Sequence, residues 1–292
     1  MKTINKIKNE LNLDIKKVSL YNNIKYVETD KGNYIIKKAF DNKVFRILEK
    51  NNFNNYIGNI KTINGYNVFN YIDDIQIDVN ERALDLITLM SKLHKLTNYY
   101  KNITIIEIKE FYEEKINYIK DLTNYYDYLR FIIEEKKHHT TTDIYFLKNL
   151  SIIYMSLDLV TKYVEEWYLI MKEKNSIRYS LIHNNLNLSH IIENDSPFLI
   201  SWDNYKYDIP IYDFINFYKK DFKDLDFLDL FNIYKNNINL SKEEILLTYI
   251  ELLMPKKIIL EENDLKNIYE LTYQNIYLNK TYFFVSEDNK IN

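Results

Sequence analysis

The spacing of the apolar residues changes once along this chain, and that change limits the folds the chain can adopt. Between residues 16 and 72, apolar and polar residues mostly alternate in short runs that end at Asn-Asn, Asp-Lys-Gly or Asn-Gly. Alternation is typical of strands with one buried face, and these endings favour tight turns. From residue 78 onward, apolar residues mostly recur every three or four positions, as on the buried face of a helix. We therefore expect a β-rich first part and a mainly helical second part.

The β-rich part contains three predicted strands, a helix and two further strands. The strands are expected at 16–22, 24–29 and 33–40, and apolar residues at helical spacing predict a helix at 44–53. Gly32 supplies the positive φ of the turn before the third strand. A hairpin is expected at 60–72, because Asn64-Gly65 is a strong two-residue turn signal.

Helical patterns fill most of the remaining sequence. Asp78 with Glu81 and Ser241 with Glu244 have the spacing of capping boxes at helix starts. Strands interrupt the helices only between residues 180 and 214. The predicted helices cover 78–96, 106–120, 124–137, 144–174, 211–220, 225–236, 242–253 and 264–278.

Composition argues against several classes of partner. The formal net charge of -3 gives no electrostatic reason to expect a nucleic-acid or acidic-membrane partner. No apolar run reaches the roughly 18 residues of a membrane span, and we expect no secretory signal at the start. Cysteine is absent, which excludes disulfides and thiol catalysis and fits a reducing, cytoplasmic location.

The 28 tyrosines could stack on single-stranded nucleic acid. However, Asn, Ile, Lys and Tyr all have AT-rich codons, and genome bias explains their abundance better in a chain without a basic groove. By the same reasoning, a Gly, Pro, Asp, His or Trp carries more information here than an Asn, Lys or Tyr.

The most specific pattern is SLIHNNLNLSHIIENDSPFLISWDNYKYDIPIYDF, at 180–214. The part LIHNNLNLSHII resembles the catalytic loop of the aminoglycoside phosphotransferase and choline kinase superfamily, H-G-D-x-x-x-x-N after a strand. The part FLISWDNYKYDIPIYDF resembles the segment that follows there, I-D-W/F-D/E and then P-x-x-D-L. Five positions separate 185 from 190 and twelve separate 201 from 213, as in that superfamily. The residues that match are His183, Trp202, Asp203, Pro210 and Asp213.

Weaker matches extend the resemblance over Lys16 to Leu278. TDKGNYIIKK, LMSKLHKLT and LLMPKKI are similar to elements of the spore-coat kinase-like branch of the superfamily. The resemblance implies an α+β, two-lobe protein-kinase-like fold. The small β-rich N-lobe, a five-stranded sheet with one helix, would occupy residues 1–73, and the larger helical C-lobe 74–292.

The resemblance also assigns roles to single positions. Lys37 matches the strand lysine that contacts nucleotide phosphates. Its usual glutamate partner is missing from the expected place, where Asp41 is nearest in register and Glu49 lies a turn or two later. Asp213 matches a residue that braces the catalytic loop, and His183 matches one that holds the loop against the core.

The three positions that carry the chemistry are all altered. Asn185 occupies the position of the catalytic base, but an amide cannot take a proton at neutral pH. His190 and Ser201 occupy the two Mg²⁺-ligand positions, where Mg²⁺ favours carboxylates and an imidazole suits Zn²⁺ better. The expected phosphate loop at Asn22-Asn23 is short and lacks Gly, so close approach to phosphates is not indicated.

Other metal-binding interpretations are less favoured. Asp203 lies two residues after the altered position 201 and could substitute as a ligand, although we prefer a structural role for it. A zinc site at His183 and His190 lacks companion ligands at the usual spacing. His94 is expected in the core of its helix, and the pair His138-His139 on the surface.

The resemblance and the altered positions together predict a pseudokinase with a binding, scaffold or spore-coat-associated role. No cofactor is expected, and the partner would be an unknown protein or a small molecule. The alternative is an active small-molecule phosphotransferase that uses ATP and Mg²⁺ with rearranged residues, including Asp203. An unrelated α+β binding protein is a third possibility. The expected location is the cytoplasm, or the spore coat if the host sporulates.

Overall fold

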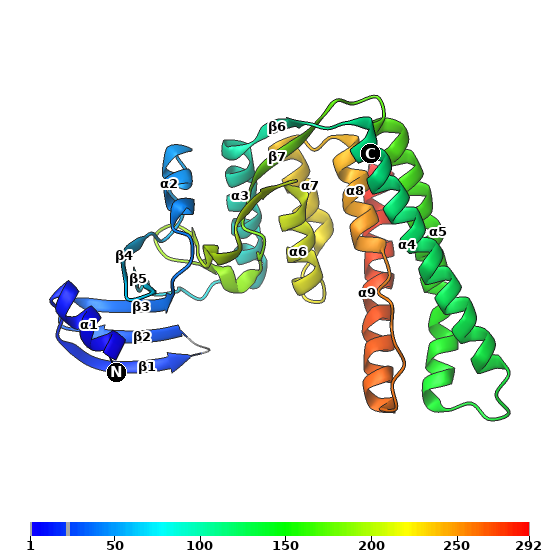
Figure 1. Cartoon of the computed structure of the whole chain (residues 1–292), viewed down its shortest axis with the longest axis horizontal. Coiled ribbons are helices and arrows are strands. Elements are labelled where there is room, and N and C mark those ends of the chain that lie inside the picture. Colours follow the sequence, from blue (N-terminus) through cyan, green and yellow to red (C-terminus); the bar gives the residue numbers. More distant parts are fainter. Residues whose placement is uncertain (1, 22–23, 292) are drawn as a thin grey trace. The chain divides into compact units, whose positions relative to one another are not determined.

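The computed structural model describes residues 2–21 and 24–291, in two compact units (Figure 1). The sheet unit comprises the chain up to Asn98 together with Ser180–Asp208. The helical unit comprises Tyr99–Tyr179 and the chain from Ile209 onward. The segment 180–208 therefore joins the sheet unit, although it follows the long helices in sequence. The expected division at residue 73 stays a prediction.

An antiparallel five-stranded sheet forms the first part of the sheet unit, in the order β1-β2-β3-β5-β4. Every strand and helix expected in this region is present, because each alternating run buries one face against a shared core. The expected turn at Asn22-Asn23 lies outside the described residues. The elements are β1 (Ile15–Tyr21), β2 (Ile24–Thr29), β3 (Gly32–Lys38), α2 (Lys43–Lys50), β4 (Asn59–Ile63) and β5 (Tyr66–Asn70).

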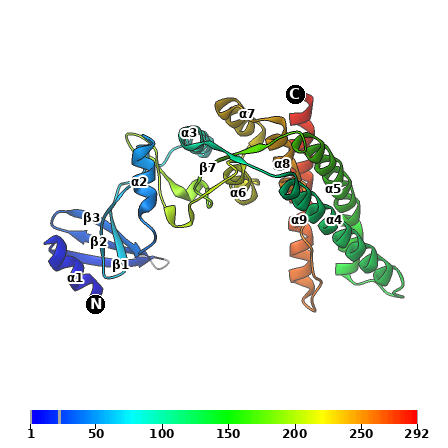
Figure 2. The ribbon, with the colours of Figure 1, turned by 45° about the horizontal axis from the view of Figure 1, so that its top comes forward.

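The sequence patterns did not predict the first helix, α1 (Lys2–Leu11). This helix lies beside the sheet, where Ile7 packs with Val27, Ile36, Ile63 and Val68 (Figure 2). These five side chains are at most 1% exposed. A short helix among lysines has few apolar positions, so its pattern is weak until the sheet supplies a surface for them.

The second part of the sheet unit surrounds α3 (Val79–Thr97). Asp78 accepts a hydrogen bond from the Asn80 amide and caps this helix as expected. His94 is buried as expected, and its carbonyl accepts a hydrogen bond from Ser180 Oγ at 3.1 Å. After β7 (Ser176–Ile182), this part contains the short elements η1 (Leu188–His190), β8 (Ile191–Ile192), β9 (Phe198–Leu199), η2 (Trp202–Asn204) and β10 (Lys206–Asp208).

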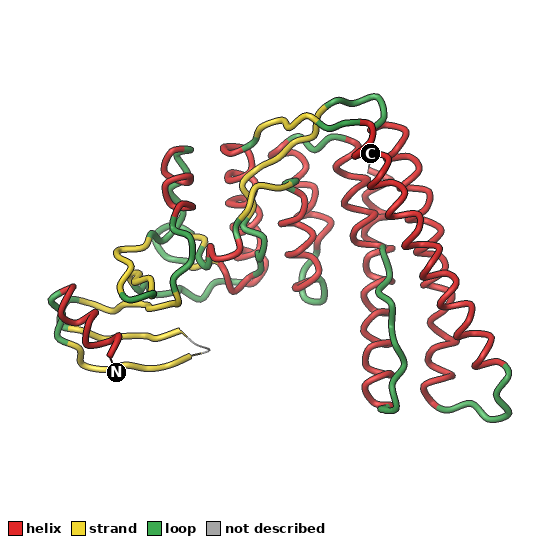
Figure 3. The backbone as a smooth tube through the Cα atoms, viewed as in Figure 1, coloured by secondary structure: helices red, strands yellow, loops and turns green. Residues whose placement is uncertain are grey.

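Helix α5 is the centre of the helical unit and packs against α4, α8 and α9 (Figure 3). The two helices expected at 106–120 and 124–137 form one continuous helix, α4, because no Gly or Pro interrupts the pattern. The helices are α4 (Ile105–Glu134), α5 (Thr141–Met171), α6 (Ile211–Asp221), α7 (Phe227–Ile238), α8 (Lys242–Leu253) and α9 (Asp264–Ile291), with strand β6 (Tyr99–Asn102) beside β7.

Helix α5 is long and apolar enough to cross a membrane by length and composition alone, the single such case in the described part of the chain. Its apolar residues have another use. Phe146, Val160 and Trp167 are at most 2% exposed, in the interface with the neighbouring helices. Part of its apolar surface is therefore buried inside the helical unit.

A buried ion pair links α7 to α9. Lys235 donates to Asp288, whose other carboxylate oxygen accepts from the hydroxyl of Tyr249 on α8. Asp288 and Tyr249 are at most 1% exposed, and Lys235 is 8% exposed. Burial, and then the hydrogen bond to Asp288, raise the pKa of Tyr249. Removal of one charged partner would deprive a buried charge of its oppositely charged neighbour.

We predict that Asp288→Asn lowers the free energy of unfolding by about 3 kcal/mol or more, because the ammonium of Lys235 stays buried. Urea unfolding at neutral pH measures the change. A triple variant, Lys235→Met with Tyr249→Phe and Asp288→Leu, removes these three polar groups together and should recover most of the loss. An equal loss in both variants would show that shape, rather than charge, sets the stability here.

Candidate functional site

A cavity of about 440 Å³ lies within the sheet unit, between the sheet and the segment 189–202. Most of its wall is apolar or aromatic, and its polar lining includes one ammonium group and no carboxylate among the described residues. The apolar and aromatic lining residues are Ile24, Ile35, Phe40, Phe45, Ile57, Phe69, Tyr71, Ile72, Ile192, Ile200 and Trp202. The polar ones are Lys37, Asn70, Ser189, His190 and Ser201.

Lys37 is the charged group of this cavity. It lies on β3 next to the buried Ile36, so alternation turns its side chain to the opposite face. Its Nζ donates a hydrogen bond to Ser201 Oγ at 2.7 Å. Loss of hydration lowers the pKa of Lys37, and the charge of Asp203 opposes part of that effect. The ammonium of Lys37 has lost hydration and contacts a neutral hydroxyl at Ser201, which favours the binding of an anion.

Ser201 is held by an unusual backbone conformation. Its φ of 66° and ψ of 52° lie in the left-handed region, which suits Asn, Asp and Gly better than Ser. The next residue, Trp202, is 1% exposed and donates from its indole nitrogen to the Leu199 carbonyl at 3.1 Å. The sharp turn at Ser201 accompanies the burial of Trp202 in the core, while Ser201 Oγ meets Lys37.

His183 connects the two segments that carry the resemblance. The ring is fully buried, and its Nε2 lies 2.7 Å from the Ile200 carbonyl, so Nε2 carries the hydrogen and donates. The next residue, Asn184, has a φ of 62°, at the position where the superfamily motif has Gly. This geometry fits the expected role of His183 in holding the loop, and that role stays a prediction.

His190 contacts the backbone of Asn185. Its Nδ1 lies 2.6 Å from the Asn185 carbonyl, which can only accept, so Nδ1 donates this hydrogen bond. Asn187 Nδ2 lies 3.2 Å from both the Asn185 carbonyl and His190 Nδ1. The loop therefore brings positions 185 and 190 together, but His190 lines the cavity and Asn185 is not among its described lining residues.

Metal ligands are scarce at this site. The rings of His183 and His190 are 5.4 Å apart between centroids. Nowhere in residues 2–21 and 24–291 do three or more His, Cys, Asp or Glu side chains gather as a metal site. Asp203 is exposed on η2. It influences Lys37 electrostatically but is not one of the described residues that line the cavity.

The two acidic residues considered as partners of Lys37 have other roles. Asp41 lies 3.7 Å from the ammonium of Lys43 and accepts from the Lys43 amide, which is the main cause of its lowered pKa. Glu49 is exposed at the end of α2. The carboxylate that acts on Lys37 is instead that of Asp203. Asp213 is fully buried in the first turn of α6, in the helical unit.

Sequence reasoning missed Arg82, which positions the loop before β8. From α3, it donates to the Leu188 carbonyl at 3.1 Å and to the Ile191 carbonyl, and it forms an ion pair with Asp74 at 2.8 Å. Its side chain is 14% exposed. An arginine on a helix face gives no signal of this role, because its carbonyl partners lie more than 100 residues later in the chain.

We predict that Lys37→Met raises the free energy of unfolding at pH 7. Folding lowers the pKa of Lys37, so the charged ammonium destabilises the folded state. This destabilisation disappears as the pH rises toward 10.5, the ordinary pKa of lysine, because the group loses its charge. The advantage of the variant should therefore shrink between pH 7 and 10.5. Lys38→Met, at an exposed neighbour, is the matched control and should show no such pH dependence. Destabilisation at pH 7 by Lys37→Met alone would contradict the prediction.

No protein-family model matches this chain, and no curated protein matches it. Solved structures do. An aminoglycoside phosphotransferase from Alicyclobacillus acidocaldarius superposes with a TM-score of 0.68 and 10% identity, over 94% of this chain and 92% of that one. An AMP-bound spectinomycin phosphotransferase matches at 0.52 and 13% identity, over 94% and 90%. These similarities show the fold, which is the predicted α+β protein-kinase-like fold.

The choline kinase LicA from Streptococcus pneumoniae aligns over 99% of this chain and 98% of its own, at 14% identity. Its TM-score of 0.49 is too low to support an inference. The closer resemblance to the spore-coat branch stays a prediction.

Proposed function

We propose that this chain is a pseudokinase, a catalytically degenerate phosphotransferase-like protein that binds a small ligand without transferring a phosphoryl group. One observation carries the proposal. In the cavity, the ammonium of Lys37 meets the neutral hydroxyl of Ser201 at 2.7 Å, where the resemblance predicts a metal-binding carboxylate. Phosphoryl transfer depends on positioning and charge stabilisation by such groups, so their replacement removes the chemistry and leaves a binding site.

Magnesium does not fit the residues present. Mg²⁺ requires near-octahedral oxygen ligands and is held through one or two carboxylates with the phosphates. His190 offers nitrogen and Ser201 a neutral oxygen, while Asp203 is exposed and outside the described lining. We therefore derive no step that passes through a metal ion.

A nucleotide fits better than a metal. The cavity of about 440 Å³ is within the usual range for small-molecule sites, and its aromatic and aliphatic walls suit a flat heterocycle. Lys37 provides a point charge for one phosphate. The spectinomycin phosphotransferase of similar fold was solved with AMP bound, which supports a nucleotide as the first ligand to test.

We predict that AMP, ADP or ATP stabilises the protein equally in excess Mg²⁺ and in EDTA. A ligand at 100 times its Kd should add about 2.7 kcal/mol, measured from thermal unfolding. Lys37→Met should abolish this gain, whereas Lys38→Met should retain it. No transfer of the terminal phosphate of ATP to water or an added alcohol should be detectable. Stabilisation that requires Mg²⁺ would overturn the proposal.

The alternative is an active phosphotransferase in which Asp203 replaces the lost metal ligand. The effect of Asp203 on the pKa of Lys37 favours it, because it places a carboxylate within electrostatic range of the cavity. In that case Asp203→Ala would abolish Mg²⁺-dependent nucleotide binding. Under the pseudokinase proposal, the same variant changes nucleotide affinity by less than about threefold.

We predict that Ser201→Asp makes nucleotide binding depend on Mg²⁺. The left-handed backbone at this position tolerates Asp, and the new carboxylate supplies the hard, anionic oxygen that the site lacks. Affinity for ADP should rise about tenfold with Mg²⁺ in this variant only, because one charged contact is worth roughly 1.5–3 kcal/mol. Ser201→Asn has the same shape without the charge and serves as the control. An equal Mg²⁺ effect in both variants would exclude the carboxylate as its cause.

The proposal also includes a scaffold role with a protein partner, a cytoplasmic location and an association with a spore coat. These three points remain predictions from the sequence.

A further inference from the structure

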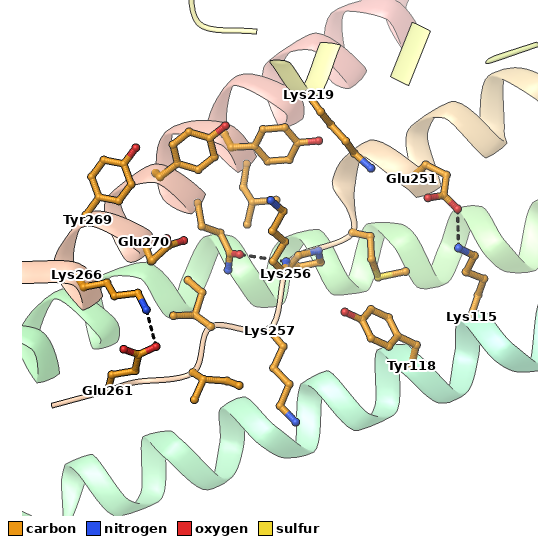
Figure 4. A pocket seen from close by; sticks show the side chains of 18 residues that line it. Lys115, Tyr118, Lys219, Glu251, Lys256, Lys257, Glu261, Lys266, Tyr269 and Glu270 are labelled. Atoms are coloured by element: carbon orange, nitrogen blue, oxygen red, sulfur yellow. Dashed lines mark hydrogen bonds and ion pairs between the residues drawn. The ribbon is translucent and has the colours of Figure 1, made fainter. Parts of the chain in front are cut away.

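A second cavity, of about 800 Å³, is formed entirely by the helical unit (Figure 4). Its wall comes from α4, the ends of α6 and α8, the connection between α8 and α9, and α9 itself. That connection runs alongside α9 (Figure 3). None of its lining residues belongs to the cavity around Lys37. It therefore goes beyond the proposed function.

Positive charge predominates around this cavity. Its lining includes five lysines and three glutamates, namely Lys115, Lys219, Lys256, Lys257 and Lys266 with Glu251, Glu261 and Glu270. Two of the lysines are paired, since Lys115 lies 2.5 Å from Glu251 and Lys266 lies 2.6 Å from Glu261. The ammonium of Lys257 lies 4.4 Å from the centre of the Tyr125 ring.

Lys219 and Lys256 supply the excess positive charge at the cavity. Loss of hydration lowers the pKa of Lys219, with the charges of Lys256 and Lys115 acting in the same direction, and Glu251 only partly opposes this. Two further ammonium groups thus act on Lys219, and the one carboxylate that opposes them, Glu251, is already paired with Lys115. Like charges held at one concave surface favour the binding of an anion.

The rest of the wall is aromatic and apolar. The rings are those of Tyr118, Tyr269, Tyr273 and Tyr277, and Met254, Pro255, Ile258 and Leu278 add apolar surface. Tyr277 donates from its hydroxyl to the Leu252 carbonyl at 2.9 Å, which fixes that ring. In Figure 4, the side chain of Lys219 extends toward Glu251.

Hydrogen bonds from α4 and α9 fix the connection that carries Lys256. Tyr126 on α4 donates to the Lys256 carbonyl at 2.5 Å and accepts from the Ile258 amide at 3.2 Å. Gln274 on α9 accepts from the Lys256 amide at 3.1 Å. Tyr126 is fully buried and Gln274 is 6% exposed. The backbone under the cavity is thus ordered before any ligand arrives, which reduces the entropic cost of binding.

We propose that this cavity binds a small organic phosphate with an aromatic body, its phosphate between Lys219 and Lys256 and its ring against the tyrosines. The excess positive charge selects the anion, and the tyrosine wall selects the ring. Lys219 and Lys256 line the same pocket as Tyr118 and Tyr269 (Figure 4).

The test is lysine footprinting of the whole protein with acetic anhydride, using phenyl phosphate as the probe. Phenyl phosphate should reduce acetylation of Lys219 and Lys256 several-fold. Lys220, the next residue on α6 and not among the described lining residues, is the internal control and should stay equally reactive. Because peptides are quantified one by one, protection at Lys37 reports separately on the other cavity.

Two comparisons separate the parts of the proposal. Lys256→Met should raise the phenyl phosphate concentration for half-protection of Lys219 about tenfold or more, and Lys220→Met should leave it unchanged. Inorganic phosphate, which lacks the ring, should protect far less. The proposal is wrong if Lys219 stays unprotected at about 10 mM probe, if Lys256→Met has no effect, or if inorganic phosphate protects equally.

Discussion

The contact between Lys37 and Ser201 determines the character of the candidate site. A lysine that loses hydration is costly, and a hydroxyl compensates the charge less than a carboxylate would. The nearest compensating charge, on Asp203, is exposed and screened by water. The positive charge in the cavity is therefore only partly compensated, which favours a negatively charged ligand. A Mg²⁺ ion would instead need negatively charged ligands from the protein. This partly compensated positive charge is the physical basis for proposing that the site binds an anion.

The sequence predicts the fold correctly where the apolar residues of a strand or helix recur with one clear spacing. The five strands and α2 follow from alternation and turn residues, because each strand buries one face of one sheet. Helix α1 was not predicted, because it has few apolar residues and these are buried only by contact with the sheet. The division of α4 into two predicted helices was wrong, since an interrupted apolar pattern does not break a helix that contains no Gly or Pro.

Only part of the site could be expected from the sequence. The family resemblance implied that His190 and Ser201 share one site, and both line the cavity that contains Lys37. The resemblance could not show that Asn185 meets His190 through its backbone carbonyl, or that Arg82 holds the loop from α3. The lysine-rich cavity of the helical unit was equally invisible, because its wall joins helices whose residues are up to about 160 positions apart. These contacts and this cavity arise from the packing of distant segments, so no short stretch of the sequence predicts them.

The left-handed positions show how this backbone makes its sharp turns with few glycines. In the described residues, the non-glycine residues with positive φ are five asparagines and Ser201, in a chain with only three glycines. Asn tolerates this conformation through local hydrogen bonds, so it can take over turns that glycine would otherwise make. Asn184 does so at the glycine position of the loop motif. Ser201 keeps a conformation that suits Asp better, because the burial of Trp202 depends on the same turn. The burial of Trp202 thus fixes the backbone at residue 201 whether or not the side chain there carries a carboxylate.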